Sequence, residues 1–117
     1  MATFSKNGLS GSTNGKAIKV VATSTAGTTI HTAVSGTDDW DEVWLWAVNS
    51  DTTPRKLTIE WGEATAPDGN IEATIPAESG LVLVAPGLML QNGLVATAFC
   101  ASANVVMVHG YVNQIRT

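Results

Sequence analysis

Residues 42–48 read Glu-Val-Trp-Leu-Trp-Ala-Val, a run that places apolar side chains on both faces of any strand that it forms. A turn follows, and residues 55–61 (Arg-Lys-Leu-Thr-Ile-Glu-Trp) then alternate between polar and apolar side chains. Such alternation is typical of a strand with one buried face. A solitary small sandwich would leave one face of the first strand in water, so residues 42–48 require a second apolar partner surface. The two runs therefore predict a β-hairpin in a protein that assembles with other subunits.

The orientation of the first strand leaves two alternatives. The apolar face of residues 57–61 belongs to the core. In one arrangement Val43, Leu45 and Ala47 join that core, and Trp44 and Trp46 face away from it. In the other arrangement the two tryptophans lie in the core and the three smaller residues face outward. We favour the first arrangement, because each indole brings an N–H that needs a partner and about 150–250 Å² of surface to cover, which an interface supplies. Trp44 and Trp46 are therefore candidate interface residues, and the alternative keeps both in the core.

The rest of the chain contains further short β-patterned runs, separated by clusters of Gly, Pro, Asn and Asp. β-Branched residues dominate these runs, and Gly or Pro interrupts them at intervals shorter than the roughly 11 residues of an average helix. The spacing predicts an all-β, single-domain, jelly-roll-like β-sandwich of about eight antiparallel strands. The expected strands are residues 16–22, 28–34, 42–48, 55–61, 70–75, 81–85, 93–100 and 104–112.

The beginning of the chain differs in composition from the rest. Residues 5–15 are rich in Gly, Ser and Asn, and Phe4 and Leu9 are the only large apolar side chains of residues 1–15 beyond Met1. Such a segment cannot hold a fold by itself. We therefore expect residues 1–15 to form a flexible arm, residues 16–117 to form the sandwich domain, and Phe4 or Leu9 to dock on a neighbouring subunit.

Charge and hydropathy restrict the classes of partner. Only 14% of the residues are charged, the net charge is −4, and the six basic residues are scattered along the chain without forming a cluster. The scattered basic residues argue against direct binding of nucleic acid, and the low charge favours buried contacts between subunits. No run approaches the roughly 20 apolar residues of a membrane span, and the first residues lack the apolar segment of a secretory signal. We expect no membrane partner and synthesis in the cytoplasm.

Groups that could carry chemistry are few. Cys100, the one cysteine, lies in an apolar run and is expected to be a small buried side chain. His31 and His109 lie in separate strands without a metal-binding spacing, so structural or interface roles are expected. The acidic run at residues 38–42 (Asp-Asp-Trp-Asp-Glu) fails the calcium-loop spacing and is interpreted as a solvated loop, or as a contact for a basic residue of another subunit. We expect neither enzyme activity nor a cofactor.

Exposed tryptophans also allow a second function. Trp40, Trp44 and Trp61 could form a platform on which sugars stack, as in a carbohydrate-binding module. Such platforms carry polar groups that bind hydroxyls, and the aspartates of residues 38–41 could serve. Most modules of this kind and size are exported, whereas the first residues of this sequence lack the pattern of a secretory signal. The carbohydrate-binding module therefore remains an alternative.

Taken as a whole, the chain resembles a family of small virion proteins of tailed bacteriophages, encoded among the head genes. The likeness extends from about Asn7 to Ile115 and consists of strand-and-turn patterns. It is carried by residues 55–62 (Arg-Lys-Leu-Thr-Ile-Glu-Trp-Gly), 66–77 (Ala-Pro-Asp-Gly-Asn-Ile-Glu-Ala-Thr-Ile-Pro-Ala), 80–88 and 103–113.

The resemblance implies a head cement or decoration protein, a β-sandwich that binds the outer shell as a homotrimer and stabilises it. The implied partners are further copies of the chain and the major capsid protein, and the implied location is the capsid surface of the virion. A tail or head–tail connector component is the alternative within the virion. No catalytic residue is implied.

Overall fold

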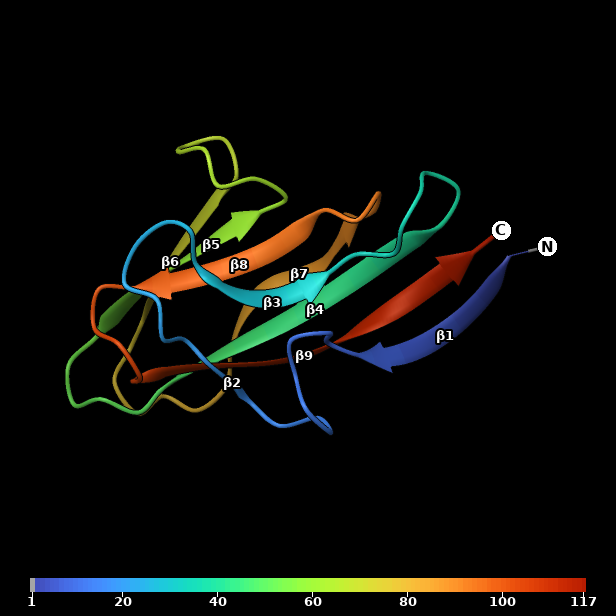
Figure 1. Ribbon diagram of the computed structural model, residues 1–117. Helices are drawn as coiled ribbons and strands as arrows, with labels where there is room; N and C mark the ends of the chain where they lie inside the picture. Colours follow the sequence, from blue (N-terminus) through green and yellow to red (C-terminus); the bar gives the residue numbers. More distant parts are fainter. Residues whose placement is uncertain (1) are drawn as a thin grey trace.

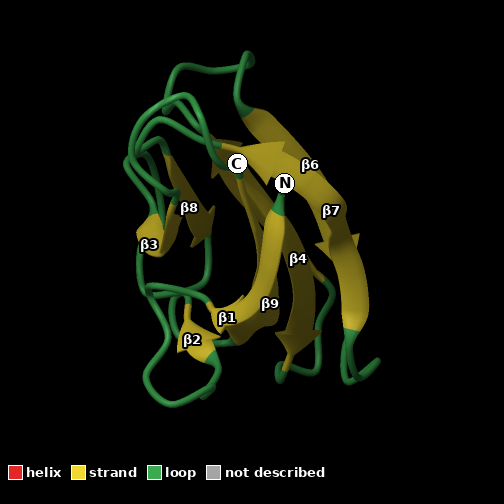
Figure 2. Ribbon diagram, turned by 90° about the vertical axis from the view of Figure 1, so that its right-hand side faces the viewer, coloured by secondary structure: helices red, strands yellow, loops and turns green. Residues whose placement is uncertain are grey.

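The computed structural model describes residues 2–117 as two antiparallel sheets that pack into a β-sandwich (Figure 1). One sheet has the order β1-β9-β4-β7, with β2 also paired to β9 (Figure 2). The other has the order β3-β8-β5-β6. Within the described residues the strands are β1 (Thr3–Gly8), β2 (Ile18–Lys19), β3 (Thr28–Thr32), β4 (Trp40–Asn49), β5 (Arg55–Trp61), β6 (Asn70–Ile75), β7 (Val82–Leu90), β8 (Val95–Cys100) and β9 (Val106–Arg116).

The connectivity is that of a jelly roll with one added strand. When β1 is set aside, the sheet β2-β9-β4-β7 faces the sheet β3-β8-β5-β6, which is the order produced by two nested Greek keys. The predicted all-β, single-domain fold is therefore confirmed. Residues 2–117 form no helix that is long and apolar enough to cross a membrane.

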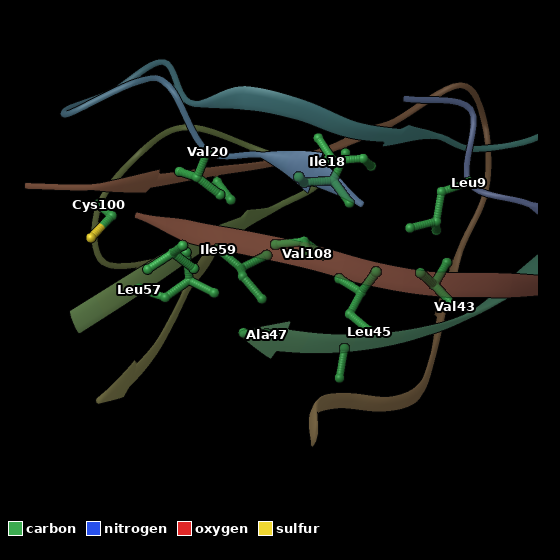
Figure 3. Close-up of a cluster of buried hydrophobic side chains, with 14 of the residues drawn as sticks. Leu9, Ile18, Val20, Val43, Leu45, Ala47, Leu57, Ile59, Cys100 and Val108 are labelled. Atoms are coloured by element: carbon green, nitrogen blue, oxygen red, sulfur yellow. The ribbon is translucent and has the colours of Figure 1, made fainter. Parts of the chain in front are cut away.

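Alternate residues of β4 enter the core. Val43, Leu45 and Ala47 are fully buried and pack with side chains of β5 and β9 (Figure 3). Trp44 and Trp46, which lie between them in the sequence, point to the outer side of the five-stranded sheet and are partly exposed. The favoured orientation of this strand is confirmed, because a strand places successive side chains on opposite faces.

Residues 2–15 contain more regular structure than their composition suggests. Thr3–Gly8 form β1, which pairs with β9 in unbroken register from Thr3 opposite Arg116 to Gly8 opposite Tyr111. Every side chain of β1 is exposed, so the strand is joined to the sheet through its main chain. Hydrophobic patterning does not detect such a strand. The expected boundary at residue 15 therefore differs from the structure, while the mobility of this segment stays a prediction.

Leu9 does not dock on a neighbour in the way that its position suggested. Its side chain is 4% exposed and lies in the core cluster of this same chain (Figure 3). The next two residues bind the edge of the opposite sheet: the Gly11 N–H donates to the Ile30 carbonyl (3.0 Å), and Ser10 Oγ accepts from the Thr32 N–H (2.7 Å). Residues 9–11 thus close one edge of the sandwich, and the expectation for Leu9 is wrong.

The outer face of the four-stranded sheet also departs from the simple alternation of β5. Glu60 was expected on a solvent-facing side, but it is only 1% exposed. Its carboxylate accepts hydrogen bonds from the Thr25 hydroxyl (2.6 Å), the Thr97 hydroxyl (2.6 Å) and the Gly27 N–H (2.8 Å). The segment between β2 and β3 therefore crosses this face and covers it around Glu60.

Candidate functional site

The most distinctive surface is a cluster of three aromatic side chains on the outer face of the five-stranded sheet, which we call the aromatic face. Trp44 and Trp46 project from β4, and Tyr111 projects from the neighbouring β9, directly opposite Trp44. The ring centroids lie 6.2 Å apart for Trp44 and Trp46, 6.4 Å for Trp44 and Tyr111, and 5.9 Å for Trp46 and Tyr111. The rings are stacked, and together they form a rigid, partly exposed apolar surface.

Polar contacts fix the position of Trp44. Its indole N–H donates to Glu42 Oε1 (2.7 Å), and the Asn113 amide donates to the same oxygen (3.0 Å). The hydrogen bond from Asn113, followed by that from Trp44, holds the pKa of Glu42 below its usual value. The indole N–H is therefore satisfied within the chain, and the face of the ring is left for contact with something else.

A bulge in the neighbouring strand β7 makes room for Trp44. Gly87 has a φ of +75°, and a Cβ at this position would lie 2.9 Å from the Trp44 ring. Glycine is needed here both for the positive φ and for the close approach of the ring. The sequence Pro86-Gly87 was interpreted as a turn, but β7 continues through it as an irregular strand. The bulge thus shapes the aromatic face.

Apolar side chains extend the aromatic face towards both edges of the sheet. Phe4, on β1, is 70% exposed and lies opposite Ile115 of β9. On the other side, Leu83 of β7 is 47% exposed and lies opposite Trp46. The Lys6 ammonium lies 4.6 Å from the centre of the Tyr111 ring, a cation–π contact that leaves one positive charge beside the apolar surface. The combined surface spans β1, β9, β4 and β7.

Of the residues singled out as interface candidates, the structure brings Trp44 and Trp46 together and places Phe4 on the same face of the sheet. Leu9 is excluded by its burial. The sequence analysis did not single out Tyr111, which directly precedes the buried Val112. Its place opposite Trp44 follows only once the pairing of β4 with β9 is known. That pairing joins distant parts of the chain, so patterning alone could not reveal it.

The expected structural role of His31 is confirmed. Its Nδ1 accepts the Ser10 N–H (3.0 Å), so its Nε2 carries the proton that it donates to Asp41 Oδ2 (2.7 Å). Asp41 is itself buried and also accepts from the Val34 N–H and the Gln114 amide. The interpretation of residues 38–42 as a solvated loop is therefore wrong at Asp41, because its carboxylate is buried and accepts hydrogen bonds from groups of the same chain.

The three tryptophans of the sugar-stacking alternative do not form one platform. Trp40 and Trp61 line a common cavity at one end of the sandwich, whereas Trp44 belongs to the aromatic face. Cys100 is buried, as expected. Among residues 2–117 no three His, Cys, Asp or Glu side chains are grouped closely enough to hold a metal ion.

Comparison with protein-family models, with curated proteins and with solved structures found no match for this chain.

Proposed function

We propose that this chain is a structural protein of a bacteriophage virion, a capsid cement or decoration protein that self-associates as a homotrimer and binds the major capsid protein on the outer shell. The observation that carries the assembly part of this proposal is the exposed aromatic face. The virion part rests on the resemblance of residues 55–62, 66–77, 80–88 and 103–113 to small head proteins of tailed phages.

The chemistry of the aromatic face fits a protein interface. Tryptophan and tyrosine dominate the binding energy of many interfaces, because they bury a large area at a small entropic cost. Here Trp44, Trp46 and Tyr111 are held in place by mutual stacking and by the bond from Trp44 to Glu42. A partner therefore meets a surface that is already ordered, which reduces the free energy that association must supply.

The two sheets also suggest which surface is used. The four-stranded sheet has its outer face covered at Glu60 by the segment that contains Thr25 and Gly27. The five-stranded sheet has its outer face uncovered, with Phe4 and Leu83 exposed beside the aromatic cluster. A specific contact needs about 1,000 Å² or more of buried area in total, and a face of four adjacent strands can provide it.

Light scattering after size exclusion tests the self-association directly. At micromolar concentration we expect an oligomer with the mass of a trimer, and a protein that stays monomeric up to its solubility limit would contradict the proposal. The matched variants are Trp46→Ala, which should weaken association, and Lys56→Ala, which alters an exposed side chain of the other sheet and should not.

The assignment to the shell needs a separate measurement. Shells that lack the protein, incubated with it and sedimented, should carry it at a fixed stoichiometry, and a cryo-EM map should place it on their outer surface. Density at the tail or at the head–tail connector would favour the alternative position within the virion. An oligomer that never binds a shell would overturn the assignment to the capsid while leaving the assembly surface intact.

A further inference from the structure

A cavity separate from the aromatic face lies at the end of the sandwich where β4 begins and the β7–β8 turn closes. Its volume is about 410 Å³, within the range of roughly 300–1,000 Å³ that is usual for small-molecule sites. Trp40, from the start of β4, and Trp61, from the end of β5, line it together with Leu90 and Leu94. Side chains from both sheets thus meet around one hollow.

Two of the side chains that line this cavity, Trp61 and Gln91, are held by hydrogen bonds within the chain. The Trp61 indole N–H points to the Met89 carbonyl at 3.4 Å, which ties the ring to β7. The Gln91 amide nitrogen donates to the Asp39 carbonyl (3.0 Å) and to the Thr37 carbonyl (3.3 Å). These two bonds use the donors of Gln91 and leave its Oε1, within the described chain, without a donor. The cavity therefore combines two indole rings, of which that of Trp61 is tied to β7, with the amide oxygen of Gln91 as an available hydrogen-bond acceptor.

The charge of the lining limits the class of ligand. Glu63 is the only ionised side chain that lines the cavity within residues 2–117, and it is exposed. A carboxylate at the rim repels anionic ligands and accepts hydrogen bonds from hydroxyl groups. Trp40 is 40% exposed. A ligand that stacks on the exposed Trp40 ring would have its own other face in water. A ligand with one apolar face and several hydroxyl groups satisfies all of these conditions.

We propose that this cavity binds the ring of a neutral pyranose sugar. The C–H face of the ring stacks on the Trp40 indole, and Gln91 Oε1 accepts a hydrogen bond from a hydroxyl, with Glu63 available to a second one. A purely aliphatic ligand would leave Gln91 unsatisfied, and an acidic sugar would be repelled by Glu63. The site shares no residue with the aromatic face, so sugar binding and self-association can succeed or fail independently.

Saturation-transfer NMR on the full-length protein tests the proposal. The probes are the methyl pyranosides of glucose, galactose, mannose and N-acetylglucosamine, each compared with a linear trisaccharide of the same sugar, and methyl glucuronide serves as the anionic probe. We expect saturable binding of at least one neutral sugar, with transfer strongest to the protons of one ring face, and no binding of the glucuronide. Tighter binding of the trisaccharide would identify a polysaccharide as the source, and equal binding a free sugar.

Variants assign the binding to this cavity. Trp40→Ala should weaken it at least about tenfold, since an aromatic contact of this kind is removed, while Trp40→Phe should retain most of it. Gln91→Ala should also weaken binding, and Val21→Ala, which shortens an exposed apolar side chain outside the cavity, should leave it unchanged. Melting curves of each variant establish that it is folded.

Two results would overturn the proposal. One is the absence of saturable binding of every neutral probe to the folded wild-type protein. The other is binding that Trp40→Ala and Gln91→Ala leave unchanged, because the sugar would then bind elsewhere. Neither result touches the proposed assembly, which is read from the mass of the oligomer.

Discussion

The outer faces of the two sheets differ in whether the chain itself covers their side chains. On the four-stranded sheet, the chain folds back over its own surface, and Thr25 and Gly27 bind the buried carboxylate of Glu60. On the five-stranded sheet nothing in the described chain covers Trp44, Trp46 and Tyr111, which stack on one another and remain partly exposed. The first face is covered around Glu60 by hydrogen bonds within the chain and is polar where it is exposed, at Lys56 and Glu72. The second offers an ordered apolar surface to a partner.

This difference indicates where substitutions should affect folding and where they should affect assembly. A side chain bound by its own chain contributes to the free energy of unfolding of the monomer. A side chain that is exposed in the monomer and buried by a partner contributes mainly to the free energy of association. Substitutions around Glu60 should therefore change the free energy of unfolding, and substitutions on the aromatic face should change the free energy of association.

The largest effect should follow removal of the aromatic cluster. Trp44→Ala and Trp46→Ala should each weaken association by about 2 kcal/mol or more, and the double variant by about 3 kcal/mol or more, as expected for buried aromatic anchors. Sedimentation equilibrium over a concentration series measures the change. If both variants associate as tightly as the wild type, the aromatic face is not the interface, and the contrast between the two faces loses its functional meaning.

A smaller effect, on folding alone, should follow substitution of the covered carboxylate. Glu60→Gln replaces one acceptor oxygen by an NH₂ group, either at Oε2, which accepts from Thr25, or at Oε1, which accepts from Thr97 and Gly27. The hydrogen bonds to that oxygen are lost, so the free energy of unfolding should fall by about 1–2 kcal/mol. Urea denaturation measures it. Glu72→Gln is the control, since Glu72 is half exposed and its ion pair with Lys56 should contribute less than about 0.5 kcal/mol.

The pH dependence of this effect has a definite sign. Burial raises the pKa of Glu60, but the hydrogen bonds from Thr25, Thr97 and Gly27 outweigh it and hold the pKa below its usual value of 4.5. A pKa lowered by folding stabilises the protein above the unfolded-state pKa, and this stability is lost as the pH falls through the folded-state value. The difference in melting temperature between wild type and Glu60→Gln should be constant near neutral pH and shrink in acid below about pH 4. A difference that grew in acid would contradict this.

The smallest effect on folding should come from β1. Deletion of residues 2–8 removes a strand whose side chains are all exposed, so the free energy of unfolding should change by less than about 1 kcal/mol. The same deletion removes Phe4 from the edge of the aromatic face and should lower attachment to the shell. Leu9→Ala, in the core, is the positive control for destabilisation. A large loss of stability on deletion of residues 2–8 would make β1 an integral part of the sandwich.

The sequence supports the fold class and the orientation of β4 well, because both depend on local alternation. Val43, Leu45 and Ala47 are buried and the intervening tryptophans face outward, as expected, although the Trp44 N–H is bound by Glu42 of the same chain and not by a partner. Patterning fails where the main chain alone makes the contacts, as in β1, and where a strand continues through residues typical of a turn, as β7 does at Gly87.

The parts of the candidate sites that escape prediction depend on distant segments. Tyr111 joins Trp44 because β9 pairs with β4. Glu60 is buried because a segment far away in the sequence crosses it. Trp40 and Trp61 share a cavity because the ends of strands from different sheets meet. Alternation assigns a side chain to one face of a strand, but only the tertiary structure determines what covers that face.

The attachment of β1 has a mechanical consequence. A force that pulls Thr3 away from β9 separates the paired residues of β1 and β9 one after another, so each step breaks few hydrogen bonds. The opening stops at Leu9, whose side chain is in the core, and at Gly11, which is bonded to Ile30. Up to that point about 20 Å of extended chain is released, at roughly 3.4 Å per residue, while the sandwich stays folded. The first strand can therefore act as an extensible tether that yields under load before the domain does.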